Sequence, residues 1–139
     1  TPDRCTECGV VCASREELFA TSDIVTVHLV LSDRTRGLIG TTEFQMMKPT
    51  AYLVNTSRGP IIQESALVSA LQSGSIAGAG LDVYDTEPLP QNHPLRDLDN
   101  AVLTGHTGYV MRENYVTGYR GVVEDVSAWL NGEPVRLLN

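Results

Sequence analysis

Short apolar runs alternate with longer amphipathic stretches through most of this chain. The apolar runs are rich in β-branched or small residues, which is typical of buried strands. The stretches between them place apolar residues at helical spacing. This pattern predicts strands at 23–27, 51–54, 76–84 and 101–103, and helices after Ser14, from Thr41 or Thr42, at 63–73 and at 112–130. Strands and helices that alternate in this way predict an α/β fold with an open, doubly wound parallel sheet.

The last predicted helix carries a continuous apolar stripe. Its members recur every three or four residues and therefore share one helical face: Tyr115, Tyr119, Val122, Val126 and Trp129. Gly132 follows as a helix terminator. We expect the stripe to need a partner surface, because a long exposed apolar face favours association.

The composition is that of an acidic globular chain. It has 139 residues, 42% of them hydrophobic, and a formal net charge of −7. The charge argues against nucleic acids and anionic membranes as partners, and no apolar run approaches the roughly 18 residues of a membrane span. The chain opens with neither a Met nor a signal peptide, so we expect a fragment or a processed piece of a longer chain. Three cysteines do not form a secreted disulfide framework, so we expect a cytoplasmic protein.

Three cysteines lie near the start of the chain, at positions 5, 8 and 12. Cys5 and Cys8 have the spacing of half a zinc site or of a redox pair. A zinc site needs four ligands, and the sequence contains no second cysteine pair. We therefore expect no bound metal and three reduced thiols.

Candidate chemical groups follow the carboxyl ends of the predicted strands. The polar loop at 55–60 comes directly after the strand at 51–54 and contains one cation, Arg58. Ligands of open α/β sheets bind at this edge. The other groups near strand ends are His28, Asp82, Glu87 and His106. A surface arginine on an ordinary connection, and histidines with structural hydrogen bonds, are the alternative interpretations.

Arg58, Glu87 and His106 together suit proton transfer at a carbonyl that lies beside a carboxylate. Histidine is the usual general acid and base near neutral pH. Glu87 can hold one nitrogen of the His106 ring, which fixes the tautomer and stabilises the imidazolium. The planar guanidinium of Arg58 can bind a carboxylate through two parallel hydrogen bonds. Spacing alone does not bring the three side chains together.

A series of longer motifs runs through the same region. They are Leu-Ser-Asp-Arg-Thr-Arg-Gly-Leu-Ile-Gly (31–40), Met47-Lys48-Pro49, Asn-Thr-Ser-Arg-Gly-Pro-Ile-Ile (55–62), Ala66-Leu67 with Ala70-Leu71 and Gly74-Ser-Ile76, Gly-Leu-Asp-Val-Tyr (80–84) with Glu87-Pro88, and Leu103-Thr104 with His106 and Gly108-Tyr109. With these motifs, the span from Leu18 to Tyr109 resembles the NAD-binding domain of the D-isomer-specific 2-hydroxyacid dehydrogenases. This family includes D-3-phosphoglycerate dehydrogenase and glyoxylate/hydroxypyruvate reductases.

The resemblance implies roles for the three central residues. Arg58 would bind the carboxylate and carbonyl of the substrate, a small anionic 2-oxo or 2-hydroxy acid. His106 would be the proton donor and acceptor, and Glu87 its carboxylate partner. Formate dehydrogenases of the same superfamily have Gln in place of Glu87, so an oxo-acid/hydroxy-acid couple is favoured. In reduction, hydride would pass from the cofactor to the carbonyl carbon.

The resemblance also implies a cofactor site for NAD or NADP. The sequence does not distinguish between these two cofactors. Thr56, Ser57 and Arg58 would line the nicotinamide side, and Asp82 would meet the carboxamide. His28 would lie along the dinucleotide. His106 and Gly108 complete the expected cofactor-binding set.

The resemblance implies that the sheet is incomplete. The first βαβ unit, with the Gly-x-Gly-x-x-Gly loop and the acidic ribose-binding residue, would precede Thr1. We expect its two strands to belong between those at 23–27 and 51–54. Residues 1–110 would then be the later part of the cofactor domain, and 111–139 a helix and tail returning toward the substrate domain. Gly105 replaces a usual Pro, which could loosen the loop that carries His106.

Two further expectations concern the isolated chain and a different class of function. Without a Gly-rich loop, the chain alone should be inactive and bind dinucleotide weakly. Its open sheet edges and apolar helix predict a homodimer or a rearranged strand order. Transcriptional corepressors share this fold and triad, so a dinucleotide-sensing binding module is the alternative function.

Overall fold

The computed structural model describes residues 2–138, which form two units. The first unit ends at His106 and the second begins at Thr107. Each unit is compact by itself, and they are described here one after the other.

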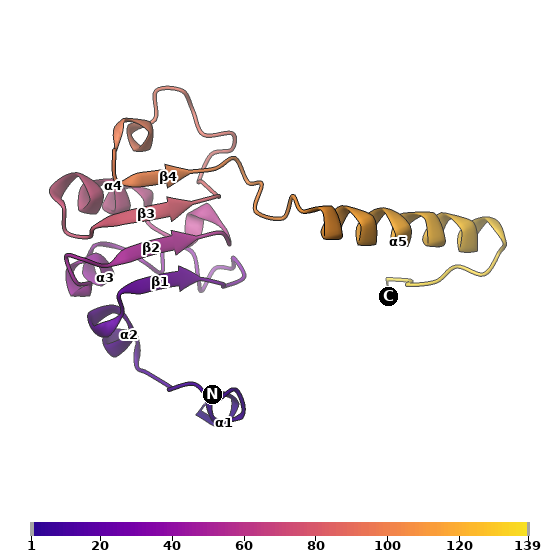
Figure 1. Cartoon of the computed structure of the whole chain (residues 1–139), viewed down its shortest axis with the longest axis horizontal. Helices are drawn as coiled ribbons and strands as arrows, with labels where there is room; N and C mark the ends of the chain where they lie inside the picture. Colours follow the sequence, from indigo (N-terminus) through magenta and orange to yellow (C-terminus); the bar gives the residue numbers. More distant parts are fainter. Residues whose placement is uncertain (1, 139) are drawn as a thin grey trace. The chain divides into compact units, whose positions relative to one another are not determined.

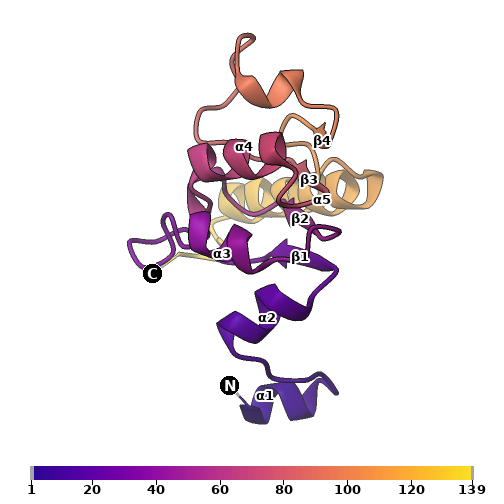
Figure 2. The same ribbon diagram turned by 90° about the vertical axis from the view of Figure 1, so that its left-hand side faces the viewer.

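A four-stranded parallel sheet forms the centre of the first unit (Figure 1). The strands are β1 (Ile24–Val27), β2 (Tyr52–Asn55), β3 (Gly78–Leu81) and β4 (Ala101–Leu103), and they are hydrogen-bonded in chain order. The helices α2 (Arg15–Thr21), α3 (Thr41–Met46) and α4 (Glu64–Ser73) all lie on one face of the sheet (Figure 2). Right-handed crossovers between successive neighbouring strands place their helices on the same side. The first unit therefore corresponds to one half of a Rossmann-like, doubly wound sheet.

The expected position of the additional strands is wrong. Residues Ile24 to Val27 pair directly with Tyr52 to Asn55, so no gap exists between β1 and β2. Among the described strands the order is also not rearranged. A single short crossover through α3 connects β1 to β2. Such a crossover places the second strand directly beside the first. A further strand would have to join the other edge of β1.

Local capping explains where the helices begin and end. Ser14 accepts from the backbone N–H of Glu17, and the Glu17 carboxylate accepts from the N–H of Ser14, which is the predicted capping box. The prediction that Thr41 or Thr42 caps α3 is wrong. Gly40 is the N-cap, and its N–H donates to the carboxylate of Glu43 at 2.7 Å. Since Glu43 supplies the acceptor, no threonine hydroxyl is needed.

Three elements differ from the predicted pattern. A helix, α1 (Pro2–Glu7), precedes α2 where no element was predicted. The third strand is confined to Gly78–Leu81 within the predicted 76–84. The proline-rich segment after it contains a 3₁₀ turn, η2 (Pro94–Asp97), and a second 3₁₀ turn, η1 (Gly59–Ile61), follows the Arg58 loop. Short helical turns of this kind leave weak periodic signals in a sequence.

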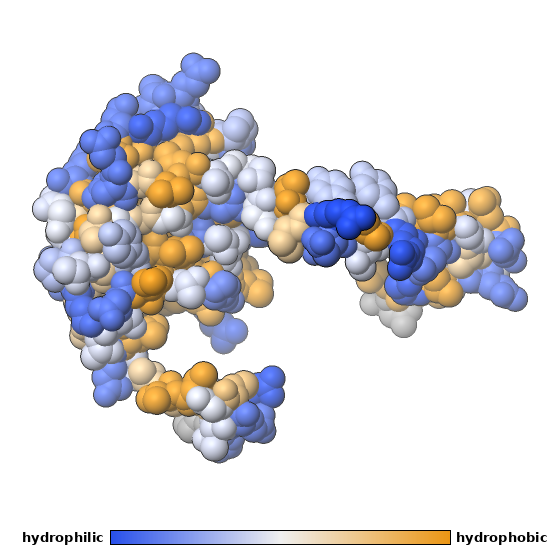
Figure 3. Space-filling model, in the orientation of Figure 1, coloured by the Kyte–Doolittle hydropathy of each residue, from blue (hydrophilic) through white to orange (hydrophobic). Residues whose placement is uncertain are grey.

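The core lies between the sheet and the helical layer, and the other sheet face is open. Inward residues such as Leu53, Ile61 and Ile76 are fully buried. On the opposite face, Ile24 is 64% exposed and Val102 is 71% exposed. Figure 3 shows apolar residues gathered over the strands on this face. The alternation of buried and exposed positions along β1 follows from the two-residue period of a strand.

The second unit consists of α5 (Arg112–Leu130) and a tail that folds back on it. The rings of Tyr115 and Tyr119 stack with centroids 5.9 Å apart. In the tail, Arg136 donates to the carboxylates of Asp125 and Glu124 at 2.8 and 3.1 Å. The apolar stripe of α5 is exposed within this unit. Among the described residues, no helix is long and apolar enough to cross a membrane.

Candidate active site

The strand register aligns the exits of all four strands. Val27, Asn55, Leu81 and Leu103 occupy one row across the sheet. The next residue of each chain segment therefore leaves the sheet at the same carboxyl edge. This edge is where parallel α/β sheets bind their ligands. The predicted convergence of the strand-exit loops is confirmed.

A buried asparagine shapes the loop that carries Arg58. Asn55 is only 1% exposed, and its Oδ1 accepts from the N–H of Ser57 at 3.0 Å while its Nδ2 donates to the carbonyl of Arg58 at 2.9 Å. The Ser57 hydroxyl donates to the carbonyl of Leu29, which joins this loop to the β1 exit. Such hydrogen bonds between side chains and the backbone satisfy N–H and C=O groups of the loop, which no longer pair with a neighbouring strand. Asn55 therefore determines the path of the loop.

Close backbone packing joins the Arg58 loop to the β3 exit. A Cβ atom on Gly59 would lie 2.1 Å from the carbonyl carbon of Tyr84 and 2.6 Å from the backbone nitrogen of Asp85. No side chain fits in that space, so position 59 requires glycine. The Arg58 loop and the loop that leads to Glu87 consequently form one packed body.

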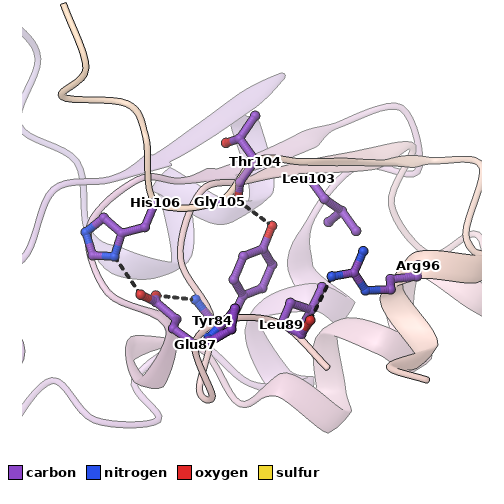
Figure 4. Close-up of a pocket in the computed structure, with 9 residues that line it drawn as sticks. Tyr84, Glu87, Leu89, Arg96, Leu103, Thr104, Gly105 and His106 are labelled. Carbon is purple, nitrogen blue, oxygen red and sulfur yellow. Dashed lines mark hydrogen bonds and ion pairs between the residues drawn. The ribbon is translucent and has the colours of Figure 1, made fainter. Parts of the chain in front are cut away.

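His106 and Glu87 form a hydrogen-bonded pair at the wall of a pocket (Figure 4). Nδ1 of His106 lies 2.6 Å from Oε2 of Glu87, and Oε1 of Glu87 accepts from the N–H of Tyr84 at 3.0 Å. Both carboxylate oxygens are thus engaged. The hydrogen bond to His106, then that from Tyr84, lower the pKa of Glu87, and the charge of Arg58 adds to this effect. The pairing of His106 with Glu87 that was expected from residue types is present.

His106 also has an unusual backbone conformation. Its φ is 58°, in the left-handed region that non-glycine residues seldom occupy. The side chains of His106 and Glu87 are 38% and 35% exposed, so the imidazole borders solvent. The hydrogen bond from Nδ1 to the Glu87 carboxylate orients the imidazole ring.

Tyr84 and Thr104 tie the β3 exit to the β4 exit. The Tyr84 hydroxyl lies 2.8 Å from the carbonyl of Thr104 and 3.0 Å from that of Leu81. The Thr104 hydroxyl donates to the carboxylate of Asp82 at 2.5 Å. Burial, followed by the nearby charge of Asp82, raises the pKa of Tyr84. Asp82 is itself buried, so its carboxylate is held in a fixed orientation.

Behind the pair lies a pocket of about 190 Å³. Tyr84, Leu103 and His106 line it, and Arg96 closes its far side (Figure 4). Arg96 donates to the carbonyls of Pro90 and Leu89 at 2.8 and 2.7 Å, which holds the proline-rich segment in place. This arginine therefore supports the wall that carries Glu87.

The remaining predicted site residues are distributed along the same edge, with one exception. His28 is exposed and its Nε2 lies 2.9 Å from the Thr26 hydroxyl. Thr56 is exposed beside the half-buried Ser57. Gly108 belongs to the second unit and is described separately from the others.

Sequence reasoning missed the supporting residues Asn55, Tyr84 and Thr104. Asn55 and Tyr84 stood inside recognisable motifs, but a polar residue at a strand end is also common in ordinary turns. The structure shows that Asn55 and Tyr84 are buried and that all three side chains hydrogen-bond at the strand exits.

A family model agrees with the site. Residues 1–108 match the model described as D-isomer specific 2-hydroxyacid dehydrogenase, NAD binding domain. The chain belongs to this family. Its Arg58, Glu87 and His106 therefore lie on the carboxyl edge of a family NAD-binding domain.

Individual members of the D-2-hydroxyacid dehydrogenase family are similar over nearly the whole chain. A glyoxylate reductase of Aeropyrum pernix is 45% identical over 96% of this chain and 40% of its own length. An oxidoreductase of Ralstonia solanacearum superimposes with a TM-score of 0.89 at 38% identity, over 99% of this chain and 41% of that one. A D-lactate dehydrogenase of Lactobacillus jensenii, solved with NAD⁺, gives a TM-score of 0.84 at 26% identity, over 100% and 45%. The chain thus spans less than half the length of these relatives.

The polar groups at the edge fit one end of a dinucleotide. Thr56 and Ser57 offer hydroxyls, Asp82 a fixed carboxylate, and His28 an exposed ring. The 139 residues contain no Gly-x-Gly-x-x-Gly sequence, the turn whose backbone N–H groups bind the pyrophosphate. The chain therefore has polar groups along this edge and lacks that phosphate-binding turn.

Proposed function

We propose that the full-length parent of this chain is an NAD(P)-dependent oxidoreductase that interconverts a D-2-hydroxy acid and a 2-oxo acid. The observation that carries the proposal is the His106–Glu87 pair, joined at 2.6 Å on the ligand-binding edge of the sheet. Its support is family membership together with the arginine on the neighbouring loop.

His106 acts as the proton donor and acceptor. Glu87 holds Nδ1 and stabilises the imidazolium, so Nε2 presents its proton to the substrate oxygen. When the 2-oxo acid is reduced, Nε2–H protonates the carbonyl oxygen; in the reverse direction, Nε2 takes the hydroxyl proton. A bound nicotinamide supplies or accepts the hydride. The lowered pKa of Glu87 keeps its carboxylate charged throughout this cycle.

Arg58 binds the anionic end of the substrate. Its guanidinium is near enough to Glu87 to lower the pKa of that carboxyl, so it lies beside the proton donor. Nη1 donates to the carbonyl of Ser57 at 2.6 Å, which anchors the guanidinium at one corner. The remaining N–H groups can grip a carboxylate and orient the adjacent carbonyl toward His106.

The same edge would hold the cofactor. Thr56, Ser57 and Arg58 would line the nicotinamide side, Asp82 would meet the carboxamide, and His28 would lie along the dinucleotide. His106 would belong to this set as well, and Gly108, in the second unit, keeps the cofactor role that the family resemblance implies. The edge groups carry no signal that separates NAD from NADP, so either cofactor is consistent with the proposal.

The test compares two variants of the full-length parent. His106→Ala should lower kcat by at least about 100-fold, because general acid catalysis contributes about that much or more. Arg58→Lys should raise KM for the anionic substrate more than it lowers kcat, because a lysine cannot form the two parallel hydrogen bonds that a guanidinium makes to a carboxylate. Steady-state kinetics with NADH and glyoxylate or hydroxypyruvate measure both effects.

Undiminished turnover by His106→Ala would remove His106 from the proposed role. Lack of turnover by an intact parent that still binds NADH would favour the dinucleotide-sensing module instead. His28→Ala is the matched control for a histidine substitution, because His28 should affect dinucleotide binding and leave the kcat of the saturated enzyme nearly unchanged.

The cellular setting and assembly belong to the same proposal. The three cysteines are free thiols, which is the usual state in a reducing, cytoplasmic compartment. The exposed apolar stripe of α5 and the open sheet face support a homodimer. No nucleic acid or membrane partner is proposed, in keeping with the net charge of −7.

A further inference from the structure

The segment between β3 and β4 carries Glu87 and has little regular structure. It contains Pro88, Pro90 and Pro94, and most of its residues lie outside helices and strands. In Figure 1 the segment leaves the sheet after β3 and returns to it at β4. Because the hydrogen bonds of a helix or strand fix few of these residues, the position of Glu87 depends on contacts between this segment and neighbouring elements.

His93 stands at the start of η2 in this segment and uses both of its ring nitrogens. Nδ1 accepts from the N–H of Leu95 at 3.3 Å, and Nε2 lies 2.9 Å from Oε1 of Glu64. A neutral imidazole carries one proton, so with Nδ1 as the acceptor it is Nε2–H that donates to the carboxylate. The His93 side chain is 15% exposed and Leu95 is fully buried, so the contact lies at the edge of the core.

The bond from His93 connects two parts of the catalytic edge. Glu64 is the first residue of α4, the helix that follows the Arg58 loop and η1. The hydrogen bond therefore joins the segment that carries Glu87 to the element that follows Arg58. The close packing at Gly59 joins the same two parts of the chain before Glu87, and the bond to Glu64 joins them after it. Glu87 is thus held from both directions along the chain.

Arg96 connects η2 to the backbone near Glu87. Its side chain donates to the carbonyls of Leu89 and Pro90 at 2.7 and 2.8 Å. Leu89 is only two residues after Glu87, and Arg96 lies within η2, the turn that His93 caps. A displacement of η2 would therefore be passed to the backbone beside Glu87.

We propose that His93 is a positioning residue for the His106–Glu87 pair and that it acts through its hydrogen bond to Glu64. With this bond intact, η2 and the adjoining backbone hold the Glu87 carboxylate at Nδ1 of His106. Without it, the carboxylate leaves the ring for part of the time, and His106 loses the partner that selects its Nδ1–H form. The catalytic consequence rests on the proposed function, whereas the positioning itself can be measured without turnover.

Nitrogen NMR of this chain measures the positioning directly. The sequence has three histidines, so the ring signals of His93 and His106 can be assigned by substitution. The ring nitrogen chemical shifts distinguish an Nδ1–H imidazole from an Nε2–H imidazole. At mildly alkaline pH, we expect the wild-type chain to show Nε2–H on His93 and Nδ1–H on His106.

Two substitutions separate the bond to Glu64 from the cap of η2. In His93→Asn the amide oxygen can still accept from the Leu95 N–H, but the side chain is too short to reach Glu64. In His93→Gln the amide N–H takes the place of Nε2–H and can keep the bond to Glu64. We expect His106 to lose its preference for Nδ1–H in His93→Asn and to keep it in His93→Gln. Glu64→Ala breaks the same bond from the other side and should match His93→Asn.

Kinetics of the full-length parent measure the catalytic consequence. His93→Asn should lower kcat by about 10-fold, which is part of the roughly 100-fold or more that general acid catalysis contributes, and should leave KM for NADH nearly unchanged. Asn92→Ala, at an exposed neighbouring position, is the matched control and should change neither the His106 signals nor kcat. A loss of stability alone would reduce the amount of folded protein and leave the His106 tautomer of the folded chain unchanged.

An unchanged His106 tautomer in both His93→Asn and Glu64→Ala would overturn the proposal. An equal effect of His93→Gln would also overturn it, because the cap at Leu95 would then be responsible. If the tautomer changes as expected but His106→Ala retains full turnover, the positioning stands and the proposed function fails. Circular dichroism and thermal unfolding confirm that each variant is folded at the temperature of measurement.

Discussion

At the scale of single residues, the candidate site depends on polar groups whose orientation is fixed by other polar groups. Glu87 uses one oxygen for the Tyr84 N–H and the other for His106. Asn55 directs the Arg58 loop through two hydrogen bonds while nearly fully buried. Each of these groups would be costly to leave unpaired. The position of Arg58 thus depends on Asn55, and that of His106 depends on Glu87 and, through it, on Tyr84.

Glu87 makes a testable contribution to stability. Its pKa is lower in the folded chain than its ordinary value, chiefly because His106 and then the Tyr84 N–H bond to its carboxylate. A carboxyl with a depressed folded pKa stabilises the protein above its unfolded pKa, and this contribution disappears as the pH falls through the folded value. We predict that wild type is more stable than Glu87→Gln at neutral pH and that the difference closes in acid.

Urea unfolding at a series of pH values from neutral to strongly acidic measures this difference. Glu16→Gln, at an exposed position in α2, is the control and should show no such closing gap. A constant difference between wild type and Glu87→Gln across the whole range would contradict the assignment.

At the scale of elements, three strand exits are joined into one rigid edge. Gly59 packs the β2 exit against the β3 exit, and the Tyr84 hydroxyl bonds to the carbonyl of Thr104 at the β4 exit. The strand register alone would place these loops in a row. The additional contacts hold the loops at fixed separations, which proton transfer and substrate positioning require.

A methyl group at position 59 should break this connection. In Gly59→Ala the new Cβ would overlap the backbone of Tyr84 and Asp85, and neither backbone can move without displacing the Glu87 loop. We predict a loss of about 2 kcal/mol or more in the free energy of unfolding, as for an overpacked core. Chemical denaturation measures the loss.

Gly105→Ala is the matched control for that prediction. Nothing lies within 4 Å of a Cβ atom built on Gly105, which directly precedes His106. This substitution should be neutral or stabilising by up to about 1 kcal/mol, because alanine restricts the unfolded chain. Equal destabilisation by the two substitutions would show that Gly59 has no special packing role.

Across the whole molecule, the chain exposes apolar surfaces. A full-length family member has additional residues that can cover such surfaces. This chain spans 40% of the length of the Aeropyrum pernix glyoxylate reductase. Within the first unit, Ile24, Tyr52 and Val102 lie exposed on the open sheet face. Within the second unit, the α5 stripe is exposed from Tyr115 to Trp129. Apolar surface of this kind favours association in water.

We predict that the isolated chain self-associates and binds NADH weakly. Light scattering at micromolar concentrations should give a mass above 15.1 kDa. Fluorescence titration should give an NADH dissociation constant well above that of the full-length parent, because the Gly-rich phosphate turn is absent from these residues. Tyr119→Lys, on the apolar stripe, should reduce association, and Arg120→Lys is its matched control.

A monomer that binds NADH as tightly as the parent would contradict this prediction. Self-association together with weak NADH binding would agree with both parts of the prediction.

Local patterns in the sequence were enough to predict the succession of elements and the residues at each strand exit. Periodicity and capping are local, so the capping box at Ser14, the boundaries of α5 and the place of His106 just beyond β4 could be predicted. Parallel pairing then brings strand ends to one edge by geometry alone. Recognisable motifs added the family, and they are the source of the roles proposed for Arg58, Glu87 and His106.

The pairing of strands and the contacts between distant side chains could be read only from the folded chain. Direct pairing of β1 with β2, against expectation, depends on where a crossover returns the chain. The close approach of Gly59 to Tyr84 and the contact of His106 with Glu87 join residues from separate loops. Such contacts depend on distances across the folded chain, and sequence patterns report only spacing along it.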